Sequence, residues 1–281
     1  MAYFDKYGVE FSDDRKTLIR CPKDFNGDYI IPNGVIMIAE EAFQECSSLS
    51  SIIISSSISV IEERAFILCI SLTYIMIPES VVAIEERAFA GCKSLKTINL
   101  PKSVNYIGEC AFYGCSNLTR ITLPAKYIRI ESNAFLGCCR VASIVLTADS
   151  IKEYCDLKNY HSSFARLPNC PRKLLVENKE VTDLNITNNI TQINDFAFIY
   201  CLDLTSVTIS NSVTSIGHSV FYKCSSLKQV TMPKSISSVG KSIFRSCDSL
   251  VRIYIPKGER DRFIRLGLGE YEYLFIEYEN E

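Results

Sequence analysis

The chain has 281 residues, of which 47% are hydrophobic, so it can bury a continuous core and is not expected to be disordered. Its 30 lysine and arginine residues nearly balance 32 aspartate and glutamate residues, and no basic run could follow a phosphate backbone, so nucleic acid is not expected as a partner. No apolar stretch approaches the roughly 18 residues of a membrane span.

The N-terminal segment gives the first structural prediction. Residues 9–20 read as a hairpin with a polar turn at Asp13 to Lys16, and we assign residues 1–24 to an N-terminal cap. The opening, Met1 to Lys6, lacks the basic and apolar regions of a signal peptide, which predicts a cytoplasmic protein as the chain stands. If a signal was removed earlier, the protein would instead be secreted or lie at the cell surface.

A 23-residue repeat follows the cap and defines a first array at residues 25–147. Phenylalanine recurs at this spacing, and a cysteine follows each phenylalanine three residues later. The phenylalanines of this array are Phe43, Phe66, Phe89, Phe112 and Phe135. Because a single repeat cannot bury its own apolar face, the repeats must stack on one another around one elongated core.

Within a repeat, the alternation of apolar residues from Leu95 to Leu100 predicts a strand of about three residues. Pro101 then ends the strand, because proline has no N–H for the ladder. Serine or threonine replaces this proline at Ser55, Thr147, Thr187 and Ser210. Continuing the repeat toward the N-terminus assigns an earlier set of core positions: Ile30, Pro32, Val35, Ile38 and Ala42.

An insertion at residues 148–180 separates this array from a second one. Phe135 and Phe198 are 63 residues apart, whereas two repeats span 46. A helix is expected at residues 149–166, because Ser150 and Glu153 fit a capping box, and a second hairpin is expected at residues 174–181.

The second array occupies residues 181–256 and continues the phenylalanine column at Phe198, Phe221 and Phe244. Both arrays together give about ten rungs, whose strands would form a curved parallel sheet with little helix. Residues 257–281 are expected to form a C-terminal cap, with a short helix at 259–266 closed by Gly267 and a strand-like segment at 271–278.

The repeat Ala-Phe-x-x-Cys-x-x-Leu-x-x-Ile-x-Leu-Pro-x-Ser-Val-x-x-Ile resembles that of the BspA-like leucine-rich-repeat family. The resemblance covers nearly the whole chain, including residues 7–12 and 253–258. It implies a leucine-rich-repeat solenoid with a capping hairpin and a C-terminal helix. Because members occur on the surfaces of gut and oral bacteria and some protozoan parasites, it also implies roles in adhesion and protein binding.

The 13 cysteines do not indicate catalysis or metal binding. Those of the phenylalanine column are a full repeat apart, without the close pairs of a metal site, so we interpret them as small buried side chains in reduced form. A thiol nucleophile would need a basic partner, and the chain has only His161 and His218. We therefore predict no enzyme activity, no cofactor and no metal.

The exposed face of the predicted sheet is the remaining candidate for function. Two outward columns follow from the repeat: Ser51, Tyr74, Thr97, Arg120, Ser143, Asp183, Ser206, Gln229, Arg252, and Ile53, Met76, Asn99, Thr122, Val145, Asn185, Thr208, Thr231, Tyr254. Most of these residues are polar, but Ile53, Tyr74 and Met76 bring apolar and aromatic side chains together, the composition of an interface centre.

We predict a monomeric, non-enzymatic module for protein binding or adhesion that uses this face. The residues assigned to partner binding are Ile53, Tyr74, Met76, Thr97, Asn99, Arg120, Gln229, Arg252 and Tyr254. The alternative is a structural or self-associating element without a dedicated ligand.

Overall fold

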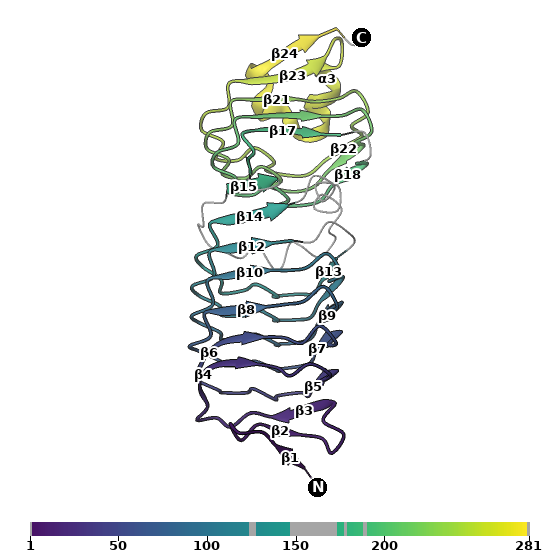
Figure 1. Cartoon of the computed structure of the whole chain (residues 1–281). Helices are drawn as coiled ribbons and strands as arrows, with labels where there is room; N and C mark the ends of the chain where they lie inside the picture. Colours follow the sequence, from purple (N-terminus) through teal and green to yellow (C-terminus); the bar gives the residue numbers. More distant parts are fainter. Residues whose placement is uncertain (1, 124–127, 147–172, 177–178, 188–189, 280–281) are drawn as a thin grey trace. The chain divides into compact units, whose positions relative to one another are not determined.

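The computed structural model describes residues 2–123, 128–146, 173–176, 179–187 and 190–279 (Figure 1). These residues fall into two compact units, the first running to Val145 and the second from Leu146 onward. Each unit is built of stacked turns of the chain. The helix expected at 149–166 lies outside the described residues.

An antiparallel hairpin begins the first unit, as the sequence predicts. Strand β1 (Tyr3–Phe4) pairs with β2 (Glu10–Phe11), and β2 pairs with β3 (Thr17–Arg20). The Asp14 carboxylate shapes the turn between β2 and β3 by accepting hydrogen bonds from the Ser12 hydroxyl at 2.6 Å and the Lys16 N–H at 3.0 Å. Strand β3 then pairs in parallel with β5 (Met37–Ile38), so the cap is joined to the first rung.

Each turn of the first unit carries two short parallel strands, one on each side (Figure 1). One side holds β4 (Asn26–Ile30), β6 (Ser48–Ile53), β8 (Tyr74–Met76), β10 (Thr97–Asn99), β12 (Arg120–Thr122) and β14 (Ser143–Leu146). The other side holds β5, β7 (Val60–Ile61), β9 (Ala83–Ile84), β11 (Tyr106–Ile107) and β13 (Arg129–Ile130). The sequence predicts only the first set, because the second strands are two residues long and show no alternation.

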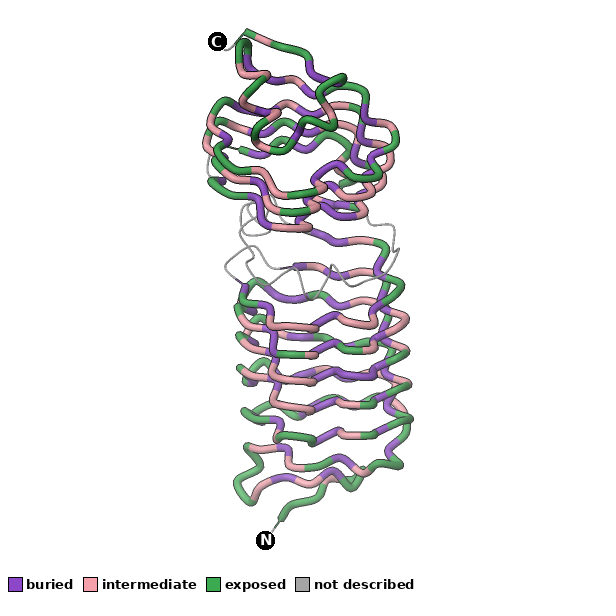
Figure 2. The backbone as a smooth tube through the Cα atoms, turned by 180° about the vertical axis from the view of Figure 1, so that it is seen from behind, coloured by how far each residue is buried: buried purple, intermediate pink, exposed green. Residues whose placement is uncertain are grey.

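Stacked phenylalanine rings form the centre of this unit. From Phe43 to Phe135, successive ring centroids are 5.0–5.2 Å apart and the planes differ by 1–18°. The backbone of the same turn also pairs rung to rung, since the Phe66 N–H donates to the Ala88 carbonyl at 2.8 Å. In Figure 2 the buried residues recur at corresponding places in successive turns. The core is therefore one column repeated along the unit.

The second unit begins with the predicted second hairpin, β15 (Lys173–Val176) and β16 (Lys179–Glu180). One parallel sheet follows with β17 (Asp183–Ile186), β19 (Ser206–Ile209), β21 (Gln229–Thr231), β23 (Arg252–Pro256) and β24 (Phe275–Tyr278). The other holds β18 (Gln192–Ile193), β20 (Ser215–Ile216) and β22 (Ser238–Val239). Its stacked rings, Phe198, Phe221 and Phe244, are 5.6–5.9 Å apart.

The C-terminal cap contains the expected short helix, α3 (Arg260–Phe263), followed by a π-helical turn η1 (Ile264–Leu268). Gly267 interrupts that turn with a φ of 102°, a conformation that glycine adopts at little cost. The strand expected over residues 271–278 forms only in part, because a 3-10 turn η2 (Gly269–Leu274) occupies its first half. Strand β24 then extends the sheet beside β23 and covers its edge.

Candidate functional site

Four apolar side chains lie together on the outer face of β4, β6 and β8. Ile30, Ile53 and Met76 are in register on the three strands, and Tyr74 stands two residues before Met76 on β8. Ile30 is 66% exposed, Met76 47% and Tyr74 44%, while Ile53 is half-buried between its neighbours. We call Ile30, Ile53, Tyr74 and Met76 the apolar patch.

Ile30 corrects one assignment made from the sequence. It was expected in the core together with Pro32, which is exposed as well. Tyr29 and Ile31 are the buried residues of this rung, with exposed fractions of 2% and 1%. Side chains alternate between the two faces of a strand, so a shift of one residue moves Ile30 to the outside. The sequence does indicate the outward position, because Ile30 stands one repeat before Ile53, which was placed on the outward face.

The other predicted residues of the first unit form a polar surface. Thr97 pairs with Arg120 and Asn99 with Thr122 in the register of β10 and β12. The Thr122 hydroxyl donates a hydrogen bond to the Asn99 side-chain oxygen at 3.1 Å. Val145 was expected on the outward face, but only 4% of it is exposed, so this assignment is wrong.

The remaining predicted residues, Gln229, Arg252 and Tyr254, belong to the second unit. Gln229 pairs with Arg252 in the register of β21 and β23, and Tyr254 lies beside Thr231. Arg252 is exposed, whereas Gln229 and Tyr254 are half-buried.

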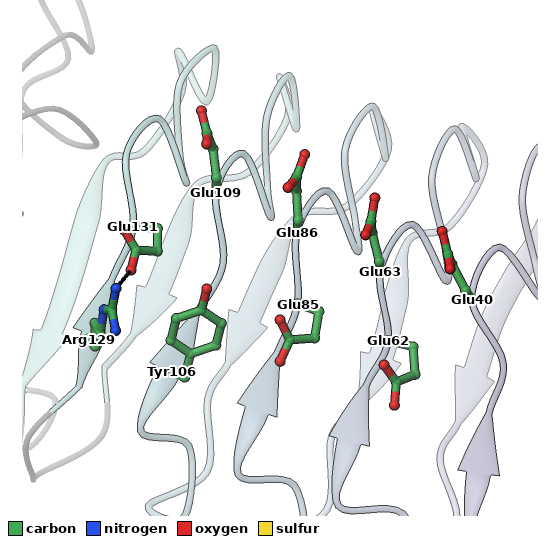
Figure 3. Close-up of a pocket in the computed structure, with 9 residues that line it drawn as sticks. All are labelled: Glu40, Glu62, Glu63, Glu85, Glu86, Tyr106, Glu109, Arg129 and Glu131. Carbon is green, nitrogen blue, oxygen red and sulfur yellow. Dashed lines mark ion pairs between the residues drawn. The ribbon is translucent and has the colours of Figure 1, made fainter.

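A second face, not anticipated from the sequence, carries a ladder of glutamates in the first unit (Figure 3). Glu40, Glu63, Glu86 and Glu109 stand on successive turns, and Figure 3 shows other acidic side chains closer to the strands. Together with Tyr106 and Arg129 they line a hollow of about 470 Å³. The repeated Ile-Glu-Glu triplets at residues 61–63 and 84–86 are the sequence signal that could have revealed this face.

Arginines neutralise this ladder only in part. Arg64 makes ion pairs with Glu40 at 3.8 Å and Glu63 at 3.2 Å, and Arg87 pairs with Glu86 at 2.5 Å. Burial, followed by repulsion from Glu62 and Glu63, raises the pKa of the Glu85 carboxyl above its ordinary range. The glutamates that line this face outnumber its arginines, so the face carries an excess of negative charge.

The column cysteines are buried hydrogen-bond donors in the core. The Cys92 thiol donates to the Phe66 carbonyl of the preceding turn at 3.2 Å, and the Cys115 thiol donates to the Phe89 carbonyl at the same distance. Burial raises the pKa of both thiols, so neither is ionised near neutral pH. For these two cysteines the arrangement supplies packing and hydrogen bonds and keeps the thiol protonated.

The structure also gives His218 a backbone role. Its Nδ1 accepts a hydrogen bond from the Lys241 N–H at 2.8 Å. His161 lies outside the described residues. Across the part of the chain that the structure describes, no three His, Cys, Asp or Glu residues converge as metal ligands. In the same residues, no helix has the length and apolarity to cross a membrane.

The fold and its two outward faces define a repeat protein of the solenoid class. A sequence model described as "BspA type Leucine rich repeat region" matches residues 27–142 and 173–261 in six copies. The chain therefore belongs to the BspA-type leucine-rich repeat family, which confirms both the resemblance and the expected fold. No curated protein matches the chain.

Solved structures of bacterial leucine-rich repeat proteins are similar to it. One from Bacteroides ovatus ATCC 8483 has a TM-score of 0.55 and 20% identity, covering 96% of this chain and 76% of that one. A leucine rich cell surface protein from Faecalibacterium prausnitzii A2-165 has a TM-score of 0.38 and 22% identity, covering 100% of this chain and 95% of that one. The likeness to the Bacteroides ovatus protein shows the fold alone.

Proposed function

We propose that this protein is a non-enzymatic module for protein binding or adhesion and that its partner contacts the apolar patch. The observation that carries the proposal is the exposure of Ile30, Tyr74 and Met76 side by side on one sheet face. Apolar side chains gathered in this way on a surface are typical of an interface centre, since water solvates them poorly.

Strand geometry supports the same proposal. Neighbouring strands of a sheet lie about 4.8 Å apart, so one ligand can contact side chains from three successive rungs. Ile53 is held between Ile30 and Met76, which gives the patch a fixed shape. A preformed surface binds with less loss of conformational entropy than a mobile one. Arg120 and Arg252 are further candidate contacts, because arginine is enriched at interfaces.

The test compares the native chain with Tyr74→Ser plus Met76→Ser in capture of proteins from a cell extract, measured by quantitative mass spectrometry. Thr208→Ser plus Thr231→Ser is the matched control, because it changes two polar residues that are in register on an outward strand face and are not assigned to partner binding. We expect the patch variant to lose at least one protein that the native and control chains retain. Undiminished capture by a patch variant with native circular dichroism would exclude this face as the site.

Self-association through the same patch is the second candidate function. Strand β4, which carries Ile30, is the terminal strand of its three-stranded sheet, and open strand edges tend to pair with other chains. We expect the protein to be a monomer, and light scattering over a range of concentrations checks this. A mass that rises with concentration in the native chain, but not in the patch variant, would favour self-association instead.

A further inference from the structure

The outer face of β7, β9 and β11 combines apolar and acidic side chains in parallel columns. Val60, Ala83 and Tyr106 are in register along one column. Glu62 and Glu85 stand two residues after the first two of these and therefore on the same side of the chain. We call these five residues the carboxylate face. Figure 3 shows Glu62, Glu85 and Tyr106 in a row below the glutamate ladder.

Met37 extends the apolar column toward the N-terminus. It precedes Val60 by one repeat and is 45% exposed, and the adjacent Ile36 is 52% exposed. An uncovered sheet face of this kind has apolar surface to bury. Its acidic column determines what kind of partner can cover it.

Arg129 demonstrates how this face holds a cation. Its guanidinium lies 5.7 Å from the centre of the Tyr106 ring and makes an ion pair with Glu131 at 2.5 Å. The ring and the carboxylate thus hold one arginine of the chain itself at the end of the hollow (Figure 3). Cation–π and carboxylate contacts of this type favour arginine over lysine.

The preceding rungs repeat the carboxylate without the arginine. Among the ion pairs of the described residues, none involves Glu62, Glu85 or Glu109. The column is interrupted at Gly108, where a Cβ atom would lie 2.6 Å from the backbone of Glu85 and Glu86. A side chain at that position would force the backbone of the neighbouring rung to shift, and with glycine the hollow stays open between Glu85 and Glu131.

We propose that the carboxylate face is a docking surface for a basic segment of a partner protein in which arginine alternates with apolar residues. The arginines pair with Glu62 and Glu85, as Arg129 does with Glu131, and the apolar residues cover Val60 and Ala83. Complementary charge selects this partner, because an acidic or neutral segment would leave the carboxylates desolvated without a counter-ion.

This proposal is independent of the apolar patch. The two surfaces belong to different strand sets, so a variant in one leaves the residues of the other unchanged. Failure of either proposal is therefore distinguishable from failure of the other.

The test uses a labelled synthetic peptide of alternating arginine and leucine, with fluorescence anisotropy at low and at physiological salt. Two further peptides replace leucine by serine or arginine by glutamate. We expect the arginine–leucine peptide to bind the full chain at least about tenfold more tightly than either of these. Glu62→Gln plus Glu85→Gln should weaken its binding by about tenfold at low salt, consistent with two lost ion pairs.

Asp248→Asn plus Asp261→Asn is the matched control, because it removes two exposed carboxylates from the second unit. This control and Tyr74→Ser plus Met76→Ser should both bind the peptide as the native chain does. The proposal is overturned if the glutamate double variant, with a native circular dichroism spectrum, binds as tightly as the native chain. Equal loss in the aspartate control, or equal binding of the glutamate–leucine peptide, would also overturn it.

Discussion

At the scale of single residues, the cysteine column shows how one side chain serves two purposes in the core. Cys69, Cys92 and Cys115 each fill space behind a phenylalanine and donate a hydrogen bond to the carbonyl of the phenylalanine one repeat earlier. A serine would present a more polar hydroxyl to the same apolar surroundings, and an alanine would remove the donor. At these three positions a protonated cysteine therefore fits better than serine or alanine.

Thiol reactivity tests this description. Burial raises the pKa of Cys92 and Cys224, so little thiolate forms at pH 8 and an alkylating reagent should leave both unmodified in the folded protein. Cys139 is exposed and should react first among the described cysteines. Peptide mass spectrometry after brief alkylation measures the order. Labelling of Cys92 as fast as Cys139 would contradict the description.

The unfolded protein provides the control for this experiment. In denaturant without reductant, nearly all 13 cysteines should react. A count lower by several would instead indicate disulfides and an oxidising compartment.

The sequence predicts the buried role of these cysteines but not their hydrogen bonds. Their burial follows from their fixed place after each phenylalanine. The carbonyl that accepts each bond is set by the path of the turn one repeat earlier, which no local pattern encodes. For Ile30, in contrast, the repeat itself gives the outward position, and the core assignment was wrong only because it was shifted by one residue.

At the scale of elements, the turn around each phenylalanine contains residues with positive φ. In one repeat these are Arg64 and Leu68, with φ of 51° and 59°, and Gly91 follows Leu68 by one repeat with φ of 75°. A side chain at positive φ costs roughly 1–2 kcal/mol, which the stacked hydrogen bonds of neighbouring turns must offset. Glycine is therefore useful at this position but is not required.

Two glycine substitutions should differ in cost for this reason. Gly91→Ala places a Cβ 2.7 Å from a terminal carbon of Leu68, which can rotate away, so the loss should stay near the roughly 1 kcal/mol of backbone strain. Gly108→Ala places a Cβ 2.6 Å from backbone atoms of Glu85 and Glu86, which cannot move unless the whole rung moves. We therefore expect a loss of about 2–3 kcal/mol in the free energy of unfolding. Denaturant unfolding measures both values. An equal loss of unfolding free energy in the two variants would show that the rungs separate more easily than their packing indicates.

The elements divide by how strongly local pattern encodes them. Both hairpins and the helix α3 were predictable, because turn residues and caps mark them in the sequence. The two-residue strands β5, β7, β9, β11 and β13 were not, since such short strands depend on pairing with the rungs above and below. The carboxylate face was missed with them, because its strands had not been recognised. For η2, alternating residues in 270–274 resemble a strand, and tertiary packing overrides that preference.

At the scale of the whole molecule, stacked repeats make stability a sum of neighbouring contacts. A phenylalanine ring inside a column contacts the rings one repeat before and after it, as Phe89 does with Phe66 and Phe112 at 5.2 Å. Binding surfaces follow the same rule, since residues of one face come from rungs 23 positions apart, such as Tyr74 and Thr97. A change at one rung should therefore affect the adjacent rungs first.

Phe89→Ala provides the corresponding prediction for unfolding. Phe89 is fully buried, so removing its ring should cost about 3–5 kcal/mol through lost burial and the resulting cavity. Hydrogen exchange should become faster in the turns that hold Phe66, Phe89 and Phe112. It should change little in β19 and β21, which belong to the other compact unit. Uniform acceleration across both units would mean that the chain unfolds as one cooperative block, and the nearest-neighbour description would then fail.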